Sequence, residues 1–495
     1  MKKILFIIWS FSLGGGAEAL LTTIVNRLNP SKYQIGILEF YHSSTKKEPV
    51  NSHIKIYNPV TFEGDREYQK KMYYTYHEPD KMIRNYVPSG YDLYISFNYQ
   101  IPSFLLPKGG RNIAWIHGAV YDLAEGGMKE YRYLQDKAFE RAMKIVTISD
   151  STSASIQALF PEHEDKVIQI HNAINIETVR EKAACFTDIE VKHPAIICVG
   201  RLDEHKDPLR MLEIFRETVR KIGPAYLYFL GKGELEAQIR QRANQYGMQE
   251  QVHILGFVEN PFPIMKQADI CCMTSKSEGG PLVLLESAAL GVPFASTEVG
   301  IARSLSNENR CGQIFATNTE AVKAIIEILN TPKDMIREEC LKSVSRFGVD
   351  SYIVRVEKLL DEALEEEPVL ENIAVWNGTE NRELLEDRKY YYRFPEGLIP
   401  QDSRVIIYGA GDVGTNYCAY IQETGSWKVA AWVDAAAEKY RQAGKEVKDI
   451  EAIFQIEYDV VLIAVMAEKL AKIIRMDLCK RGIPDSKILW VKPIF

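Results

Sequence analysis

Two basic residues stand where they could hold a charged ligand. Arg201 follows Gly200 at the end of an apolar run, and Lys206 lies in the loop that comes next. Ligands of open parallel α/β sheets bind beyond the carboxyl ends of the strands. Because an Arg guanidinium bonds phosphate oxygens in pairs and a Lys ammonium adds a compact charge, the two could hold a diphosphate. The alternative is a pair of solvated surface cations.

A second polar stretch joins an apolar run to a predicted helix. Its residues are Glu278, Gly279, Gly280, Pro281, Leu282 and, two helical turns later, Glu286. The glycines let the backbone approach a ligand, and proline suits a first helical turn. Free N–H groups at that helix start favour an anion. The acids could accept from sugar hydroxyls, with Glu286 on a ribose; the alternative is a capped helix with solvated acids.

Short apolar runs alternate with longer amphipathic stretches and would position these residues. The first series is Ile4–Trp9, Leu93–Phe97, Ile113–His117, Ile145–Ser149 and Val167–His171; the second is Ala195–Gly200, Tyr226–Gly231, Val252–Gly256, Asp269–Met273 and Pro293–Ser296. Strands that are apolar on both faces are typical of parallel sheets covered by helices. The alternation therefore predicts doubly wound α/β domains.

The length of 495 residues implies about three domains. We expect an N-terminal Rossmann-like domain over 1–190, a second over 191–366 and a small Rossmann-like domain over 403–495. A polar linker, Cys185–Pro194, separates the first two. An acidic, aromatic connector over 367–402 contains Tyr390, Tyr391 and Tyr392, so we expect part of it to pack.

Composition excludes several classes of protein. The net charge is −7, which argues against bulk nucleic-acid binding. None of the eight cysteines forms a C-x-x-C pair, so zinc and thioredoxin-like sites lack their spacing, and we expect a reducing, cytoplasmic compartment. Lys2, Lys3 and the run Ile4–Leu13 also fit a signal peptide, but the run opens a series of similar strands, which favours a buried first strand.

Four motifs occur in one order along the chain: Gly14-Gly15-Gly16-Ala17-Glu18, His117-Gly118, Gly200-Arg201-Leu202 with Lys206, and Glu278 to Glu286. Over about residues 1–366 the sequence resembles glycosyltransferase family 4, the retaining GT-B enzymes. The resemblance implies two Rossmann-like domains that face each other across a cleft, with the acceptor on the first and a nucleotide sugar on the second. There are two departures: Asn175 stands where many members carry an acid, which weakens any role assigned there, and Gly280-Pro281-Leu282 stands where many members carry a phenylalanine before a Gly-Leu pair, which leaves the donor sugar open.

The resemblance also implies roles for individual residues. Arg201 and Lys206 would bind the diphosphate, Glu286 the ribose and Glu278 the transferred sugar. The remaining donor contacts would come from Gly15, Gly16, Gly200, Gly279, Gly280, Pro281 and Leu282. His117 would line the sugar site from the first domain; the alternative is a structural histidine.

The implied reaction transfers a sugar from an NDP-sugar, expected to be a UDP-sugar, to an acceptor hydroxyl with retention. The acceptor would be a glycan or lipid-linked oligosaccharide of bacterial surface polysaccharide synthesis. No D-x-D triplet occurs, so we expect no metal site and activity that survives EDTA. Alternatives are another GT-B enzyme, such as an NDP-sugar epimerase, or a non-catalytic nucleotide-sugar-binding subunit.

The segment Arg66–Arg84 mixes basic and aromatic residues. It could rest on the anionic inner face of a membrane. Glu67, Glu78 and Asp80 dilute its charge, which favours a solvated face instead.

The last unit carries a G-x-G-x-x-G pattern. Its glycines are Gly409, Gly411 and Gly414, after the run Arg404–Tyr408, and Asp434 ends a second run, Lys428–Val433. In a βαβ context this pattern indicates a dinucleotide such as NAD(P), with Asp434 on a ribose. The alternative is a structural or interaction module.

Overall fold

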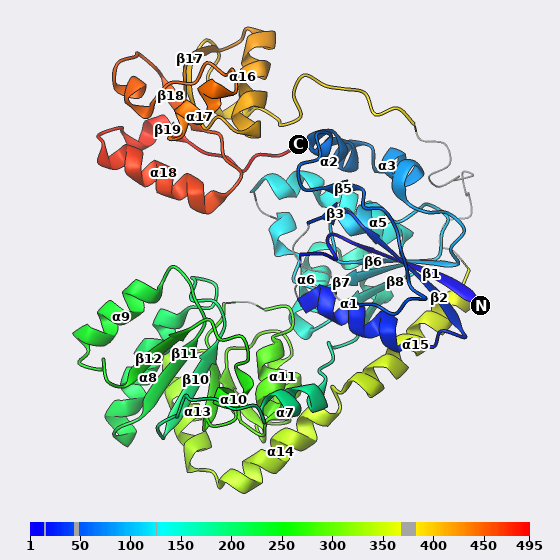
Figure 1. Cartoon of the computed structure of the whole chain (residues 1–495), viewed down its shortest axis with the longest axis vertical. Coiled ribbons are helices and arrows are strands. Elements are labelled where there is room, and N and C mark those ends of the chain that lie inside the picture. The colour runs from blue at the N-terminus through cyan, green and yellow to red at the C-terminus, as the bar shows by residue number, and fades with distance from the viewer. Residues whose placement is uncertain (14–15, 44–48, 125, 277, 368–382) are drawn as a thin grey trace.

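The computed structural model describes residues 1–13, 16–43, 49–124, 126–276, 278–367 and 383–495. Within these residues the strands form parallel sheets of seven, six and four strands and a separate two-stranded pair. Each larger sheet belongs to one α/β unit, and Figure 1 shows the three units as separate bodies of the chain. The doubly wound α/β class predicted from the sequence is confirmed.

The first domain contains the largest sheet, in the order β4-β2-β1-β6-β7-β8-β9. Its strands are β1 (Lys2–Ile8), β2 (Tyr33–Glu39), β4 (Lys55–Ile56), β6 (Leu93–Phe97), β7 (Asn112–Ile116), β8 (Lys144–Thr147) and β9 (Val167–Gln169), with the pair β3 (Tyr41–His42) and β5 (Thr61–Phe62) apart from it. Its helices are α1 (Gly16–Arg27), α2 (Tyr68–His77), α3 (Pro79–Tyr86), α4 (Ile101–Phe104), α5 (Arg132–Arg141) and α6 (Asp150–Leu159). The apolar run at Ile4 is the buried interior strand β1, which confirms the strand interpretation of that run.

The second domain contains the sheet β12-β11-β10-β13-β14-β15. Its strands are β10 (Ala195–Val199), β11 (Tyr226–Leu230), β12 (Val252–Gly256), β13 (Ile270–Met273), β14 (Phe294–Ser296) and β15 (Gly312–Ile314). Its helices are α8 (Pro208–Ile222), α9 (Glu236–Gln245), α10 (Phe262–Met265), α11 (Leu282–Ala289), α12 (Ala302–Ser306), α13 (Asn318–Asn330) and α14 (Lys333–Ser345). Cys271 and Cys272 are buried in β13 as small apolar residues.

The chain passes between the two domains at different positions from those expected. Helix α7 (Ile176–Lys182), placed by sequence in the first domain, packs in the core of the second. Helix α15 (Val349–Glu365), placed in the second, packs against α1 with Tyr352, Val356 and Leu360 in the core of the first. The apolar stripe of each helix is covered by the other lobe, so neighbours along the chain are not neighbours in the core.

The third domain contains the sheet β17-β16-β18-β19. Its elements are β16 (Arg404–Tyr408), α16 (Asp412–Thr424), β17 (Lys428–Val433), α17 (Ala437–Gln442), β18 (Val460–Ile463), α18 (Glu468–Lys480) and β19 (Ile488–Leu489). The end of the connector packs, as expected, because Tyr392 and Phe394 are buried. Residues 368–382 of the connector lie outside the described residues.

The segment Arg66–Arg84 is neither a free basic surface nor a simply solvated one. Lys70 pairs with Glu67 and Asp387, and Lys71 pairs with Asp65. Arg84 pairs with Glu383 of the connector, while Tyr74 and Tyr76 are buried. Several basic and aromatic side chains of this segment are therefore engaged in contacts within the protein, and the proposed membrane contact of these residues is not supported.

Among the residues described, no helix is both long enough and apolar enough to span a bilayer.

Candidate functional site

The carboxyl ends of β10 and β11 meet at a tight glycine junction. Gly200 has a φ of +144°, and Gly231 has a φ of +153°. A Cβ on Gly231 would lie 1.8 Å from the Gly200 carbonyl oxygen, and a Cβ on Gly200 would lie 3.7 Å from the Lys206 Nζ. Only glycine allows the loop after β10 to fold back so that the Lys206 amine lies over it.

Lys206 and Glu278 are brought together from loops that follow different strands. The Lys206 Nζ donates to Glu278 Oε1 at 2.6 Å, and the side chains are 23% and 15% exposed. Asp203 holds the loop by accepting from the Lys206 backbone N–H at 3.0 Å. Since β10 and β13 are neighbours in the sheet, their loops open at the same edge, as the sequence predicted.

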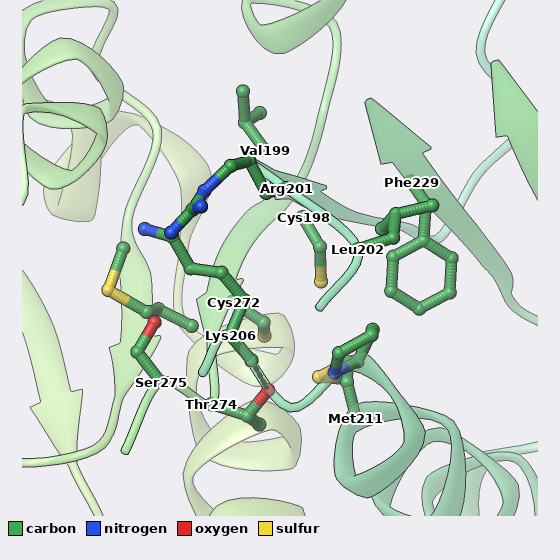
Figure 2. A pocket seen from close by; sticks show the side chains of 13 residues that line it. Cys198, Val199, Arg201, Leu202, Lys206, Met211, Phe229, Cys272, Thr274 and Ser275 are labelled. Atoms are coloured by element: carbon green, nitrogen blue, oxygen red, sulfur yellow. Dashed lines mark hydrogen bonds between the residues drawn. The ribbon is translucent and has the colours of Figure 1, made fainter. Parts of the chain in front are cut away.

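Arg201 is placed at the same edge but is more open. Its side chain is 74% exposed and forms an ion pair with Asp203 at 3.2 Å. Figure 2 shows Arg201 and Lys206 among the side chains that line one pocket at the end of β10. The structure therefore brings the two cations to one pocket, with Lys206 held in place and Arg201 free to move toward a ligand.

The start of α11 lies against the first domain. A Cβ on Gly279 would lie 2.5 Å from the His117 carbonyl oxygen, and one on Gly280 would lie 3.0 Å from Asn172 Nδ2. Ser151 Oγ donates to the Glu278 carbonyl oxygen at 3.2 Å. The glycines are needed here because the backbones of two domains meet. Pro281 precedes the helix, and no side chain caps its first N–H groups, which leaves the positive end of its dipole available to an anion.

His117 and the two glycine motifs converge on a cavity of about 450 Å³ between the domains. It is lined by Gly16 at the start of α1, His117 after β7, and Gly279, Gly280 and Leu282 from the second domain. Gly15 lies outside the described residues. Five of the predicted residues, contributed by both domains, are therefore brought to one place.

The His117 imidazole is neutral in this setting. Burial lowers its pKa to about 3, and its Nε2 has no hydrogen-bond partner in the described structure. Its ring packs on Phe97 with centroids 4.2 Å apart. A buried, unpartnered ring nitrogen beside a cavity is available to a ligand hydroxyl.

Glu286 lies within α11, eight residues after Glu278 of the preceding loop. Burial raises its pKa to about 7, and the charge of Lys182 on α7 opposes that rise. The acid therefore changes protonation near neutral pH. A ligand hydroxyl that donates to its carboxylate would favour the charged form.

A second cavity at this edge of the sheet was not predicted. It has a volume of about 700 Å³ and is lined by Gly200, Arg201, Lys232, Phe257, Val258 and Pro261 among others. Phe257 is 73% exposed. Gly200 and Arg201 follow β10 and were predicted, whereas Lys232 follows β11 and Phe257, Val258 and Pro261 follow β12. For these four residues the position at strand ends was the signal available in the sequence, and their types gave none.

The glycine loop of the third domain is tightly packed and is hydrogen-bonded to residues of its own domain. A Cβ on Gly414 would lie 1.9 Å from the Gly409 carbonyl oxygen, whereas one on Gly411 would meet nothing within 4 Å. Asp434 Oδ2 accepts from the Ala410 N–H at 2.7 Å, and Lys445 Nζ donates to the Ala410 carbonyl at 2.9 Å. The acid predicted to hold a ribose is thus bonded to the loop itself.

One cluster of potential metal ligands occurs within the described residues. Asp136, Glu162 and His163 place ligand atoms within 4.8 Å of one another. The His163 Nε2 contacts Asp136 at 2.9 Å, and the histidine is buried. The pair is satisfied without an ion, and it lies apart from the residues that line the two cavities.

Two family models match the chain. Residues 179–342 match "Glycosyl transferases group 1", and residues 401–489 match "C2185-like, N-terminal". The first match contains Arg201, Lys206, Glu278 and Glu286. The second coincides with the third domain described above.

Relatives of the chain agree with the match to group 1 glycosyltransferases. An uncharacterised glycosyltransferase of Methanocaldococcus jannaschii is 25% identical over 236 residues, which are 44% of this chain and 57% of that protein. A Campylobacter jejuni diphospho-undecaprenol N-acetylgalactosaminyltransferase is 28% identical over 30% of this chain and 40% of its own length. The chain thus spans about half the length of these first two relatives. A second Campylobacter jejuni enzyme, an alpha-1,4-N-acetyl-D-galactosaminyltransferase named for a PP-undecaprenol-linked substrate, is 24% identical over 66% of this chain and 87% of its own.

Solved structures show the same fold. Anabaena HepE in complex with UDP superimposes with a TM-score of 0.53 at 16% identity and covers 73% of this chain and 100% of its own. Sucrose-phosphate synthase of Thermosynechococcus elongatus gives 0.56 at 14% identity, over 73% and 99%. Both leave the remaining quarter of this chain unmatched.

Proposed function

The chain belongs to the group 1 glycosyltransferases of the GT-B fold and carries an additional C2185-like domain, and on that premise we propose that it transfers a sugar from a nucleoside diphosphate sugar to an acceptor hydroxyl with retention of configuration. The observation that carries the proposal is the Lys206–Glu278 pair beside the uncapped start of α11. A cation and a helix dipole at one strand edge suit a diphosphate.

The proposed chemistry depends on charge that grows on the departing diphosphate. Lys206 and Arg201 stabilise that charge, and the N–H groups at the start of α11 add to it. Glu278 binds the transferred sugar, and Glu286 accepts from the ribose. His117, with a pKa near 3, acts as a neutral hydrogen-bonding group and not as a cation.

We propose a UDP-sugar as the donor and a lipid-linked glycan as the acceptor. The support is similarity: HepE was solved with UDP, and both Campylobacter jejuni relatives are named for an undecaprenol carrier. The pocket with Phe257 and Val258 beside Arg201 is suited in size and apolar character to a base. We further propose that transfer needs no metal.

For the third domain we propose a structural role in place of dinucleotide binding. Asp434 accepts from the Ala410 and Ala436 N–H groups, so its carboxylate is already occupied. Lys445 fills the other side of the glycine loop by donating to Ala410 and Thr415.

The test combines binding and turnover. NDP-sugars are screened for thermal stabilisation, since a ligand that binds only the native state raises the apparent melting temperature. The best donor is then assayed for transfer, with EDTA present, in the wild type, in Lys206→Ala and in Lys323→Ala, an exposed lysine on α13.

We expect Lys206→Ala to lower kcat by about 10²–10³ because it removes a donor to the leaving group. Lys323→Ala should match the wild type. Full turnover by Lys206→Ala would contradict the diphosphate role, and a free epimerised NDP-sugar as product would overturn the transferase proposal.

A further inference from the structure

The third domain packs against the first domain. Lys70 on α2 pairs with Asp387, and Gln69 accepts from Asn416 on α16. Phe495 packs on Tyr76 with ring centroids 5.9 Å apart, and its carbonyl oxygen accepts from Tyr131. The first and third domains therefore share one core and should move together.

One helix of the third domain reaches back toward the second domain. Figure 1 shows α18 on the side of the third domain that faces the nucleotide-binding lobe. Lys469 at the start of α18 forms an ion pair with Glu234, which precedes α9. The pKa of Glu204 is lowered chiefly by the Lys276 ammonium that donates to it, with a further contribution from the charge of Lys472 on α18.

The same side of α18 carries apolar side chains that its own sheet does not cover. Met466, Leu470, Ile473 and Met476 are between 47% and 60% exposed, whereas Ala471, Ile474 and Leu478 are buried. Ile473 lies one turn beyond Lys469, so the two share a side of the helix. Because Lys469 contacts the second domain, the apolar side is turned in that direction.

The surface opposite is the rim of the unpredicted cavity. Glu234 and Glu204 lie on the loops that follow β11 and β10, and residues of those loops, Arg201 and Lys232, line the cavity. Its lining includes Phe257, Val258 and Pro261, with Phe257 largely exposed. The ion pair of Lys469 with Glu234 thus joins the helix that carries one exposed apolar surface to a loop beside the other.

We propose that α18 is a lid of the donor pocket: the third domain moves with the acceptor domain and, on closure, brings the apolar side of α18 onto the rim that carries Phe257. The inference rests on the proposed function, because it takes the occupant of that pocket to be the nucleotide. When the first and second domains close, α18 would then cover the nucleotide in addition to these two domains and exclude water from it.

A charge exchange tests the contact. Lys469→Glu and Glu234→Lys each place like charges opposite one another, and the double variant restores an attractive pair. The probe is UDP, with its dissociation constant and off-rate measured for the full chain. We expect each single variant to weaken UDP binding about two- to five-fold, the range set by one exposed ion pair, and the double variant to recover most of the loss.

The apolar side is tested separately. Leu470→Ser with Ile473→Ser should weaken UDP binding by about ten-fold, because two half-exposed side chains no longer lose water on closure. The fraction of donor lost to hydrolysis should rise at the same time. Val354→Ser, an exposed apolar residue on α15, is the matched control and should behave as the wild type. Melting temperatures confirm that each variant is folded.

The outcomes separate the lid from the function. Wild-type affinity in the α18 variants, with UDP bound normally by the wild type, would overturn the lid alone. A wild-type chain that does not bind UDP would overturn the proposed function as well. A double charge variant whose loss equals the product of the two single losses would also overturn the lid, because it would show that the two charges act independently.

Discussion

At the scale of single residues, the two cations of the candidate site are each paired with a carboxylate. The Lys206 Nζ donates to Glu278 Oε1 at 2.6 Å. A diphosphate would share the ammonium with that carboxylate, and a sugar hydroxyl could then donate to the oxygen released. A bound donor would therefore rearrange a contact that the protein already forms, at little cost in reorganisation.

The raised pKa of Glu286 predicts a pH-dependent stability. Its folded pKa of about 7 lies above the ordinary value of 4.5, so the native state binds the proton more tightly than the unfolded state. Stability should therefore fall as pH rises from about 4.5 to 7. At about 1.4 kcal/mol per pKa unit, discounted for partial solvent access, Glu286→Gln should gain on the order of 2 kcal/mol over the wild type at pH 8 and none at pH 4.

Urea unfolding at the two pH values measures this difference. Glu362→Gln, at a partly exposed acid on α15, serves as the control for the removal of one acid. An equal effect of Glu286→Gln at both values would contradict the raised pKa.

The lowered pKa of His117 predicts that its ring stays neutral during turnover. Burial places the value near 3, so the imidazole should not titrate between pH 5 and 8. The His117→Asn variant should lose rate without changing the shape of the pH–rate profile over that range. NMR of the ring resonances provides the direct measurement, and a midpoint near 6.5 would show that the ring is solvated.

At the scale of elements, the glycines before α11 and those after β16 have different structural roles. Those at the start of α11 let two domains meet, since a Cβ on Gly279 would lie 2.5 Å from a backbone oxygen of the first domain. Those after β16 allow close helix–strand packing inside one domain. The same residue type therefore serves a site in one case and a fold in the other.

A pair of alanine variants separates these roles in the third domain. Gly414→Ala should destabilise the domain by several kcal/mol, about the scale of an overpacked core, because its Cβ would lie 1.9 Å from the Gly409 oxygen. Gly411→Ala faces open space and should leave the melting temperature unchanged. Equal stability of the two variants, followed by calorimetry, would contradict the packing role.

At the scale of the whole molecule, the third domain is joined to the first by an aromatic core. Phe495 contacts Tyr76 and Tyr392, and Arg393 pairs with Glu130. The basic and aromatic residues of α2 and α3 complete that interface. The first and third domains are therefore joined by a shared aromatic and ionic interface.

Removing one aromatic side chain should loosen this attachment. Phe495→Ala deletes a buried ring and should cost about 3–5 kcal/mol. Hydrogen exchange should rise in α2 and in the connector while the second domain is unaffected. Phe186→Ala, at an exposed position, should change neither; protection of α2 equal to the wild type would show that the ring does not hold the interface.

The local elements were largely determined by the sequence. The runs at Leu93, Val252, Arg404 and Lys428 are strands with the predicted bounds, because continuous apolar patterns and strand propensity act over a few neighbouring residues. Strand-end placement likewise located Arg201 and Lys206, since parallel strands present their carboxyl ends on one edge. The class of fold and most of the candidate site followed from these short-range rules.

Only the tertiary structure decided what those elements pack against. The return of α15 to the first domain, the burial of Lys70 and Tyr76 against the third domain, and the orientation of α18 toward Glu234 all join segments far apart in the chain. An amphipathic pattern states that a helix has an apolar side but not which surface covers it. Packing between distant segments depends on shape and charge that a single sequence does not display.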